Sequence, residues 1–266
     1  MRKVIAVTGA TSGMGKACVE KLSARGHKVY GTVYGIDMDP EWKNLPYKLL
    51  PCDITDQSSV ETFYEQVRKE EKRIDVLVNC AGFGFEGSVE DTTVEEAKFQ
   101  FEVNFFGTHR MIREVMPVMR EQGGGKIITI SSLAAQVPSI PYNGFYSMSK
   151  KAVDGLVEAL RVEGKPFGIQ AASINPGDMK TDFTAARVRA AALRPGSAHY
   201  ERAMRSIETG RKSELTSQGP EVIGKLVCHA LSGAFAKRRE DILRAFAECL
   251  TQRIIDYNRE RRILSR

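Results

Sequence analysis

The chain has 266 residues, of which 42% are hydrophobic and 27% are charged, and its formal net charge is +6 at pH 7. This composition is that of a globular protein and excludes a disordered or fibrous one, and the length suits one large α/β domain or two small ones. The basic residues are dispersed apart from clusters near 187–212 and in the C-terminal region, so we expect no nucleic acid as a partner.

Short apolar runs alternate with helical patterns along the chain. Strands are predicted at 3–8, 28–34, 47–53, 74–79, 125–131 and 168–175. Helices are predicted at 13–25, 58–70, 94–122 (one long helix or two, with a kink at Pro117), 146–163 and 220–231. This alternation predicts an α/β fold: a Rossmann-type, doubly wound parallel sheet with helices on both faces. We expect residues 1–266 to form a single domain, because no linker, repeat or low-complexity tract interrupts them.

The first predicted strand leads directly into a glycine-rich turn. The segment "TGATSGMG" at 8–15 carries Gly9, Gly13 and Gly15 at GxxxGxG spacing. Glycine permits a tight turn and lets a ligand approach the backbone. The free N–H groups and the dipole of the following helix suit a pyrophosphate. The turn therefore predicts a nucleotide site.

The segment "YSMSK" places Tyr146 and Lys150 four residues apart in a predicted helix. Residues at this spacing share one helix face. A neighbouring ammonium favours the ionised phenol and lowers its pKa, which is useful if the phenol transfers a proton near neutral pH. Taken alone, the pair is more often an incidental one on a surface helix, so its interpretation depends on the rest of the chain.

These motifs together resemble the short-chain dehydrogenase/reductase family in its single-domain form, over roughly residues 1–232. The other matching features are Asp53, "NCAG" at 79–82, Asn104 in "FEVNFFG", Ser132 in "ITISSLA" and "PGDMKT" at 176–181. The interval between Ser132 and Tyr146 is one residue longer than is usual in the family, which leaves Ser131 as an alternative, although strand alternation points the two side chains to opposite faces. Cys80 replaces the second Asn of the family's NNAG segment, and the seventh strand that usually follows 220–231 is not recognisable.

The resemblance implies an NAD(P)-dependent oxidoreductase that interconverts a secondary alcohol and a ketone. It implies Tyr146 as the general acid/base, with Lys150 lowering its pKa and binding the nicotinamide ribose, Ser132 holding the substrate oxygen, and Asn104 anchoring a water between Lys150 and solvent. Asn104 and Ser132 also have ordinary explanations, a satisfied helix break and a strand-end hydrogen bond. The implied cofactor contacts are Gly9, Thr11, Ser12, Gly13, Met14, Gly15, Tyr34, Asp53, Ile54, Asn79, Ala81, Gly82, Tyr146, Lys150, Pro176, Gly177, Met179 and Thr181. The implied substrate contacts are Ser132, Tyr146 and Phe183, and no metal is expected.

The end of the second predicted strand bears on the choice of cofactor. NAD-selective folds usually carry Asp or Glu there for the ribose 2′-hydroxyl, whereas this chain has Val33 followed by Tyr34. The missing acid removes repulsion of a 2′-phosphate, to which Ser12 is a candidate donor, although no basic residue is present and Asp37 and Asp39 follow closely. We expect NADP, with NAD as the alternative.

The substrate loop is expected at about 182–216, as a helical lid with an apolar inner face and an excess of basic residues. These basic residues belong to a solvated helix face, or one Arg meets a substrate carboxylate or sulfate. The segment 141–169 looks like the branch of hydroxysteroid and retinol dehydrogenases, which implies a hydroxysteroid, with a bile acid as one example. A fatty, terpenoid or ketoacyl carbonyl compound, a nucleotide sensor without catalysis, and an epimerase or dehydratase of the extended branch are the alternatives.

Location and assembly are inferred from weaker signals. Five widely spaced cysteines without a CxxC pair indicate neither a disulfide framework nor a zinc site and favour a reducing cytoplasm. No apolar run is long enough to span a bilayer. The resemblance implies a homodimer or homotetramer built partly from 94–122 and 146–163. A helical extension at about 237–266 carries an apolar stripe, for which packing in the protein is favoured over a membrane surface.

Overall fold

A computed structural model of the protein describes residues 2–35 and 37–231. The chain divides into two compact units, Met1–Val227 and Cys228–Arg266, and the sheet and the candidate site belong to the first. The helical extension predicted at 237–266 lies outside the described residues, so the single-domain prediction stays a prediction. Within the described ranges, no helix has the length and apolarity that crossing a bilayer requires.

A six-stranded parallel sheet forms the centre of the first unit, in the order β3-β2-β1-β4-β6-β7. Its strands are β1 (Val4–Val7), β2 (Lys28–Val33), β3 (Lys48–Pro51), β4 (Val76–Asn79), β6 (Gly125–Ile130) and β7 (Ile169–Ile174). The chain builds one half outward from β1 and then returns to β4 beside it, with Ile5 opposite Val29 on one side and Val76 on the other. This order confirms the predicted doubly wound fold, in which ligands bind beyond the carboxyl ends of the strands.

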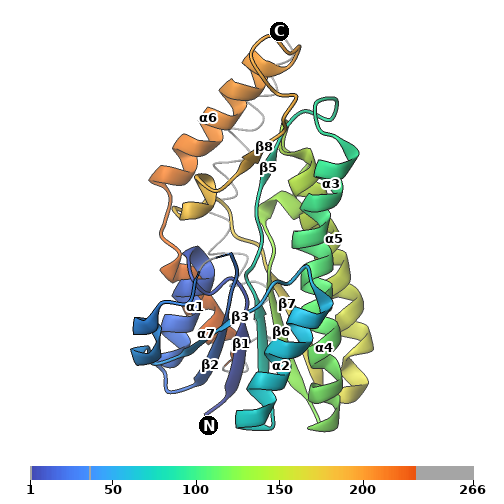
Figure 1. The fold of residues 1–266 in the computed structure, drawn as a ribbon. Helices are drawn as coiled ribbons and strands as arrows, with labels where there is room; N and C mark the ends of the chain where they lie inside the picture. Colours follow the sequence, from blue (N-terminus) through green and yellow to red (C-terminus); the bar gives the residue numbers. More distant parts are fainter. Residues whose placement is uncertain (1, 36, 232–266) are drawn as a thin grey trace. The chain divides into compact units, whose positions relative to one another are not determined.

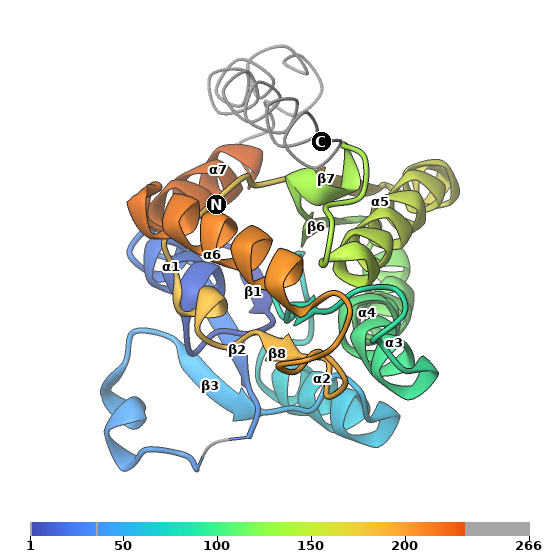
Figure 2. The same ribbon diagram turned by 90° about the horizontal axis from the view of Figure 1, so that it is seen from above.

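Helices cover both faces of the sheet (Figures 1 and 2). Helices α2 (Gln57–Glu71), α4 (Thr108–Glu121) and α5 (Gly144–Glu163) lie on one face, and α1 (Gly13–Ser23) lies on the other. Val4 and Ala6 of β1 belong to the core cluster that contains Phe63 of α2 and Met111 of α4. Because the strands are buried on both faces, they appear in the sequence as continuous apolar runs rather than as alternating ones.

The predicted helix at 94–122 is interrupted, but not at Pro117. Helix α3 (Val94–Phe101) passes into a π-helical turn, η2 (Glu102–Gly107), before α4 begins. Pro117 lies inside α4 on its exposed side, where water can satisfy the carbonyl group that loses its partner. The turn at 102–107 contains Asn104, and π-turns of this kind occur frequently at functional sites.

The substrate-side region lies beyond the carboxyl ends of the sheet strands (Figure 1). It contains a two-stranded parallel sheet of β5 (Phe85–Glu86) and β8 (Val188–Arg189), and helix α6 (Tyr200–Thr216). The sequence did not predict β5 or β8, because two-residue strands carry no periodic signal. The remaining elements are η1 (Pro40–Asn44), η3 (Leu133–Ala135), η4 (Lys165–Phe167), η5 (Asp182–Thr184) and α7 (Glu221–Leu231).

We predict opposite effects for two glycine-to-alanine changes. A Cβ at Gly15 would lie 2.0 Å from the carbonyl oxygen of Gly9, so Gly15→Ala should displace the turn and lower the free energy of unfolding by about 2–3 kcal/mol. Gly155→Ala in α5 is the control, because its Cβ would meet nothing within 4 Å and should stabilise the helix by roughly 0.5–1 kcal/mol. Urea unfolding measures both changes, and a Gly15→Ala protein as stable as the parent would contradict the first.

Candidate active site

The glycine turn that follows β1 is hydrogen-bonded to β2 and to the segment after β4. Gly9 and Gly13 have φ angles of +65° and +48°, in the left-handed region that favours glycine. The Thr8 hydroxyl oxygen accepts hydrogen bonds from the backbone N–H groups of Cys80 and Ala81, at 2.9 Å each. The backbone N–H of Gly9 donates to the hydroxyl of Thr32 at 3.0 Å. The turn is thereby held at the carboxyl ends of β1, β2 and β4.

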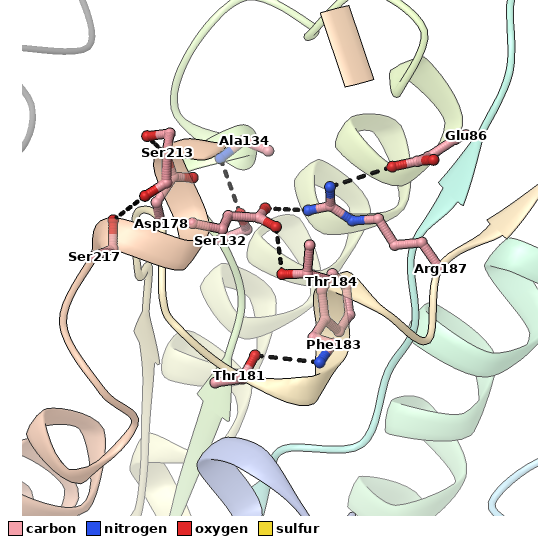
Figure 3. Close-up of polar contacts among 11 residues, drawn as sticks. Glu86, Ser132, Ala134, Asp178, Thr181, Phe183, Thr184, Arg187, Ser213 and Ser217 are labelled. Atoms are coloured by element: carbon pink, nitrogen blue, oxygen red, sulfur yellow. Dashed lines mark hydrogen bonds and ion pairs between the residues drawn. The ribbon is translucent and has the colours of Figure 1, made fainter. Parts of the chain in front are cut away.

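The segment at 176–181 lies beside this turn. A Cβ on Gly13 would be 3.6 Å from the Cβ of Thr181, so the backbone of the turn and the Thr181 side chain are neighbours. The Thr181 hydroxyl accepts from the backbone N–H of Phe183 at 3.3 Å (Figure 3). The carbonyl of Pro176 accepts from the backbone N–H of Leu133 at 2.7 Å, which joins this segment to the end of β6. Gly13 and Thr181, which are both predicted to contact a dinucleotide, are therefore neighbours beyond the carboxyl ends of the strands.

Four other predicted cofactor residues have different surroundings. Asp53 accepts two hydrogen bonds from Thr55 at Oδ1, which orients its carboxylate. Ile54 is buried and its side chain packs against Gly107, since a Cβ added at Gly107 would lie only 2.7 Å from the Cδ1 of Ile54. Asn79 is buried, and its Nδ2 donates to the Thr129 hydroxyl at 3.2 Å within the sheet. Tyr34 is 70% exposed immediately after β2.

Tyr146, Lys150 and Ser132 meet at the carboxyl end of β6. Helix α5 places Lys150 one turn after Tyr146, with its Nζ 5.8 Å from the centroid of the phenol ring. The Lys150 Nζ donates to the carbonyl of Ile130 at 3.2 Å. The Ser132 hydroxyl accepts from the backbone N–H of Ala134 at 3.1 Å, and its polar interaction with the Tyr146 hydroxyl lowers the pKa of the phenol. Ser131, the alternative, is buried and donates to the carbonyl of Lys150 at 3.3 Å, whereas Ser132 interacts with the Tyr146 side chain, so the choice of Ser132 stays a prediction.

The pKa values of this pair move in opposite directions. Burial raises the pKa of Tyr146, while the hydrogen bond to Ser132 and the charge of Arg187 lower it. Burial lowers the pKa of Lys150 to about 8, against the opposing effects of Asp154 and Cys80. The expectation that Lys150 lowers the pKa of the phenol below its ordinary value is wrong for this structure. The physical reason is that the phenol loses its hydration, while the Lys150 ammonium is directed at the Ile130 carbonyl.

Asn104 lies in the π-helical turn, and its side-chain amide is hydrogen-bonded to residues outside the turn. Its Oδ1 accepts from the backbone N–H of Phe83 at 3.0 Å, and its Nδ2 donates to the Phe83 carbonyl and the Ser149 hydroxyl, both at 3.1 Å. A Cβ on Gly82 would lie 3.1 Å from the Asn104 Oδ1 and 3.6 Å from the Lys150 Nζ. Asn104 is therefore close to Lys150 across Gly82, and the ordinary explanation of a satisfied helix break also holds. Its water-anchoring role stays a prediction.

A buried ion-pair network lies on the substrate side of Tyr146. The ring of Phe183 packs against that of Tyr146 with centroids 5.8 Å apart, and the Arg187 guanidinium lies 5.4 Å above the Phe183 ring. Arg187 pairs with Glu86 at 3.3 Å and with Glu214, and we call these three residues the Glu86–Arg187–Glu214 clamp (Figure 3). The clamp could not be predicted from the sequence, because its members lie on β5, before β8 and near the end of α6.

The remainder of the substrate-side region is apolar. A small core is formed by Phe85, Ala190, Leu193 and Ala203, with Phe83, Tyr142, Tyr200 and Ile207 packed against it. The basic residues of α6 face solvent, namely Arg202, Arg205, Arg211 and Lys212, so the solvated-face interpretation applies to them. Among residues 2–35 and 37–231, no cluster of three His, Cys, Asp or Glu side chains is arranged to hold a metal ion.

Comparison with known proteins identifies relatives over most of the chain. A family model described as short chain dehydrogenase matches residues 3–192. A 3-ketodihydrosphingosine reductase of Bacteroides thetaiotaomicron is 39% identical over 226 residues, which cover 85% of this chain and 82% of that protein. A probable short-chain type dehydrogenase/reductase, VdlC, of Helicobacter pylori is 36% identical over 66% of this chain and 65% of its own length. The crystal structure of a short-chain dehydrogenase from Streptomyces avermitilis superposes with a TM-score of 0.77 at 28% identity, covering 98% of both chains.

We predict that the clamp is required for stability. Arg187→Ala would leave the carboxylates of Glu86 and Glu214 buried without their counter-charge, and we expect the free energy of unfolding to fall by about 3–5 kcal/mol. Arg205→Ala is the matched control, because it removes the same side chain from the exposed face of α6 and should change stability by less than about 0.5 kcal/mol. Equal urea midpoints for the two variants would refute the prediction.

Proposed function

Because this chain belongs to the short-chain dehydrogenase family, we propose that it is an NAD(P)H-dependent reductase that converts a hydrophobic ketone to a secondary alcohol. The observation that carries the proposal is the convergence of Tyr146, Lys150 and Ser132 beside the glycine turn. Ser132 lies close enough to Tyr146 to lower the pKa of its phenol, and the Lys150 Nζ lies 5.8 Å from the centroid of the same ring. A nucleotide-sensing protein without catalysis has no need of this arrangement.

The proposed roles of the side chains follow from their surroundings. The bound dinucleotide supplies the hydride. The Tyr146 hydroxyl donates its proton to the substrate oxygen as negative charge develops there, and its raised pKa keeps that proton in place until it is needed. Ser132 holds the same oxygen by a hydrogen bond, as an electrostatic support. The Lys150 ammonium binds the ribose and counters charge on the phenolate, and Asn104 anchors the water that returns the proton.

The turn and its neighbours fit a dinucleotide, and we propose NADP as the preferred form. Gly9 and Gly13 have left-handed backbone angles in the turn that leads into α1, and the N-terminus of a helix after such a turn suits a pyrophosphate. Ser12 is exposed, and within the described chain its side chain makes no capping hydrogen bond. Asp39 is occupied as the N-cap of η1, where it accepts from the backbone N–H of Glu41 at 2.9 Å. Tyr34 offers an exposed ring rather than a carboxylate that would repel a 2′-phosphate.

For the substrate, we favour a long-chain ketone that carries no acid group near its carbonyl. The small apolar core of the lid suits an alkyl chain. The clamp has two carboxylates for one guanidinium, so Arg187 is already neutralised and is a poor partner for a substrate carboxylate or sulfate. The 39% identity with a 3-ketodihydrosphingosine reductase supports an amino ketone of that type as the first substrate to test.

A hydroxysteroid ranks second, because it shares the apolar body without requiring a long chain. The resemblance of segment 141–169 to hydroxysteroid dehydrogenases is what supports it, and a bile acid is disfavoured because its carboxylate would approach the clamp. We also propose a cytoplasmic homodimer or homotetramer. Exposed apolar side chains on α3, η2 and α5 support assembly through these elements, namely Phe99, Phe106 and Met148. Light scattering measures the assembly.

We predict that Tyr146→Phe abolishes turnover while leaving cofactor binding intact. Only the hydroxyl is removed, so reduction of 3-ketodihydrosphingosine should fall by at least about 100-fold, whereas quenching of NADPH fluorescence should be unchanged. A panel of ketosteroids, keto bile acids and simple ketones identifies the substrate class. Tyr142→Phe is the control, because Tyr142 precedes α5 and packs in the lid. Retained turnover in Tyr146→Phe would exclude the mechanism, and cofactor binding without turnover of any ketone would favour a sensor.

We predict that charge at position 34 changes the choice between the two dinucleotides. Tyr34 is 70% exposed, so neither Arg nor Asp there should disturb the fold. Tyr34→Arg should tighten NADPH binding about two- to fivefold and Tyr34→Asp should weaken it by a similar factor, with little effect on NADH. Fluorescence titration with each cofactor provides the test. A wild-type protein that binds NADH as tightly as NADPH would overturn the preference for NADP.

A further inference from the structure

Asp154 is a buried carboxylate that takes no direct part in the proposed proton transfer. It lies on α5 four residues after Lys150, so the two side chains share one face of the helix. Each is only 7% exposed. A carboxylate and an ammonium are therefore buried at successive turns of the helix that carries Tyr146.

One carboxylate oxygen of Asp154 accepts hydrogen bonds that link α5 to the segment after β6, which contains Ser132 and Gln136. Its Oδ2 accepts from the Nε2 of Gln136 and from the Nδ2 of Asn175, the latter at 2.6 Å. The same Nδ2 also donates to the backbone carbonyl of Ser132 at 3.2 Å. Gln136 is the C-cap of η3, the short turn that begins directly after Ser132. The carboxylate thus supports the Ser132 segment from both ends.

The hydrogen bonds of Asp154 do not by themselves require a charged side chain, as its other oxygen shows. Oδ1 is buried and accepts no hydrogen bond from any described residue. A buried, incompletely solvated carboxylate is unfavourable. An asparagine would make the same two contacts through its amide oxygen without a charge. The charge has a counterpart on this helix face, since burial lowers the pKa of Lys150 and Asp154 is the first of the groups that oppose this fall.

We propose that Asp154 is a positioning residue of the candidate site, which fixes the Ser132 segment through Gln136 and Asn175 and supplies the counter-charge to the Lys150 ammonium. The inference rests on the proposed function, because it assigns Asp154 to the support of groups that would perform that reaction. Asp154 acts through Lys150 and Ser132, and its hydrogen-bond partners are not shared with the Glu86–Arg187–Glu214 clamp.

Other titratable groups also face the reacting pair. Cys80, after β4, opposes the lowering of the Lys150 pKa as Asp154 does. On the substrate side, Arg187 lowers the pKa of Tyr146, and Glu214 and Asp178 raise it. A substitution at position 154 leaves all of these groups in place, so a change in pH dependence relative to the parent is attributable to Asp154.

The first test uses the cofactor-free protein and does not depend on activity. The Lys150 pKa of about 8 lies below its ordinary value of 10.5. Between these values the unfolded chain binds more protons, so the free energy of unfolding rises with pH. Asp154→Asn should lower the Lys150 pKa further, so that this rise begins about one pH unit lower. Thermal unfolding as a function of pH measures the onset.

The second test follows ketone reduction as a function of pH. Activity should decline on the alkaline side as Lys150 loses its proton, and Asp154→Asn should move this decline about one pH unit lower. Asn175→Ala removes a hydrogen bond but no charge, so it should lower kcat without moving the alkaline limb. Glu158→Gln is the matched control, because Glu158 lies one further turn along α5 and is exposed, and its profile should equal that of the parent.

The outcomes separate the inference from the proposed function. A lower onset in both tests for Asp154→Asn, but not for Glu158→Gln, supports the inference. The onset of stabilisation could move in Asp154→Asn although the parent protein reduces no ketone. This result would support the link between Asp154 and Lys150 and refute the proposed reductase activity. An unchanged onset in a folded Asp154→Asn protein overturns the inference. If Asp154→Asn does not fold, Asn175→Ala provides the test. An alkaline limb that moves by about one pH unit in Asn175→Ala would overturn the inference, because that variant keeps the charge of Asp154.

Discussion

The candidate site depends on keeping a lysine side chain charged inside the protein. Removing an ammonium from water is unfavourable, and Lys150 compensates with a backbone carbonyl, the carboxylate of Asp154 and the face of the Tyr146 ring. The strand ends, helix α5 and the segment after β6 supply these partners and are therefore parts of one electrostatic arrangement, which lies beside the glycine turn of the proposed dinucleotide site.

Much of the fold could be predicted from the sequence because its signals are local. The apolar runs at 3–8 and 28–34, the glycines at 9, 13 and 15, and the spacing of Tyr146 and Lys150 are all properties of adjacent residues. The doubly wound arrangement then followed from the handedness of the crossovers, whereas the order of the strands became known only from the structure.

The remainder of the site depends on contacts between distant segments. Glu86, Arg187 and Glu214 come from three elements, and Asp154 meets Asn175 and Gln136 only after the sheet has formed. The direction of the Tyr146 pKa was misjudged for the same reason. Sequence spacing revealed the neighbouring lysine, but it did not reveal the loss of water around the phenol, which is the larger effect. The short β5–β8 sheet was missed because pairing partners a hundred residues apart leave no periodic pattern.

The π-helical turn at 102–107 has a consequence for how related chains should be aligned. A π-turn contains one more residue than the corresponding α-helical turn, and each residue rotates a helix by about 100°. Deleting a single residue anywhere between the start of α3 and Asn104 would turn the Asn104 amide away from Phe83 and Gly82, even if every sequence motif were kept. The length of this segment is therefore as necessary for the contacts of Asn104 as the asparagine itself. A relative that keeps the asparagine but lacks the extra residue would not place its amide in hydrogen-bonding distance of the position of Phe83.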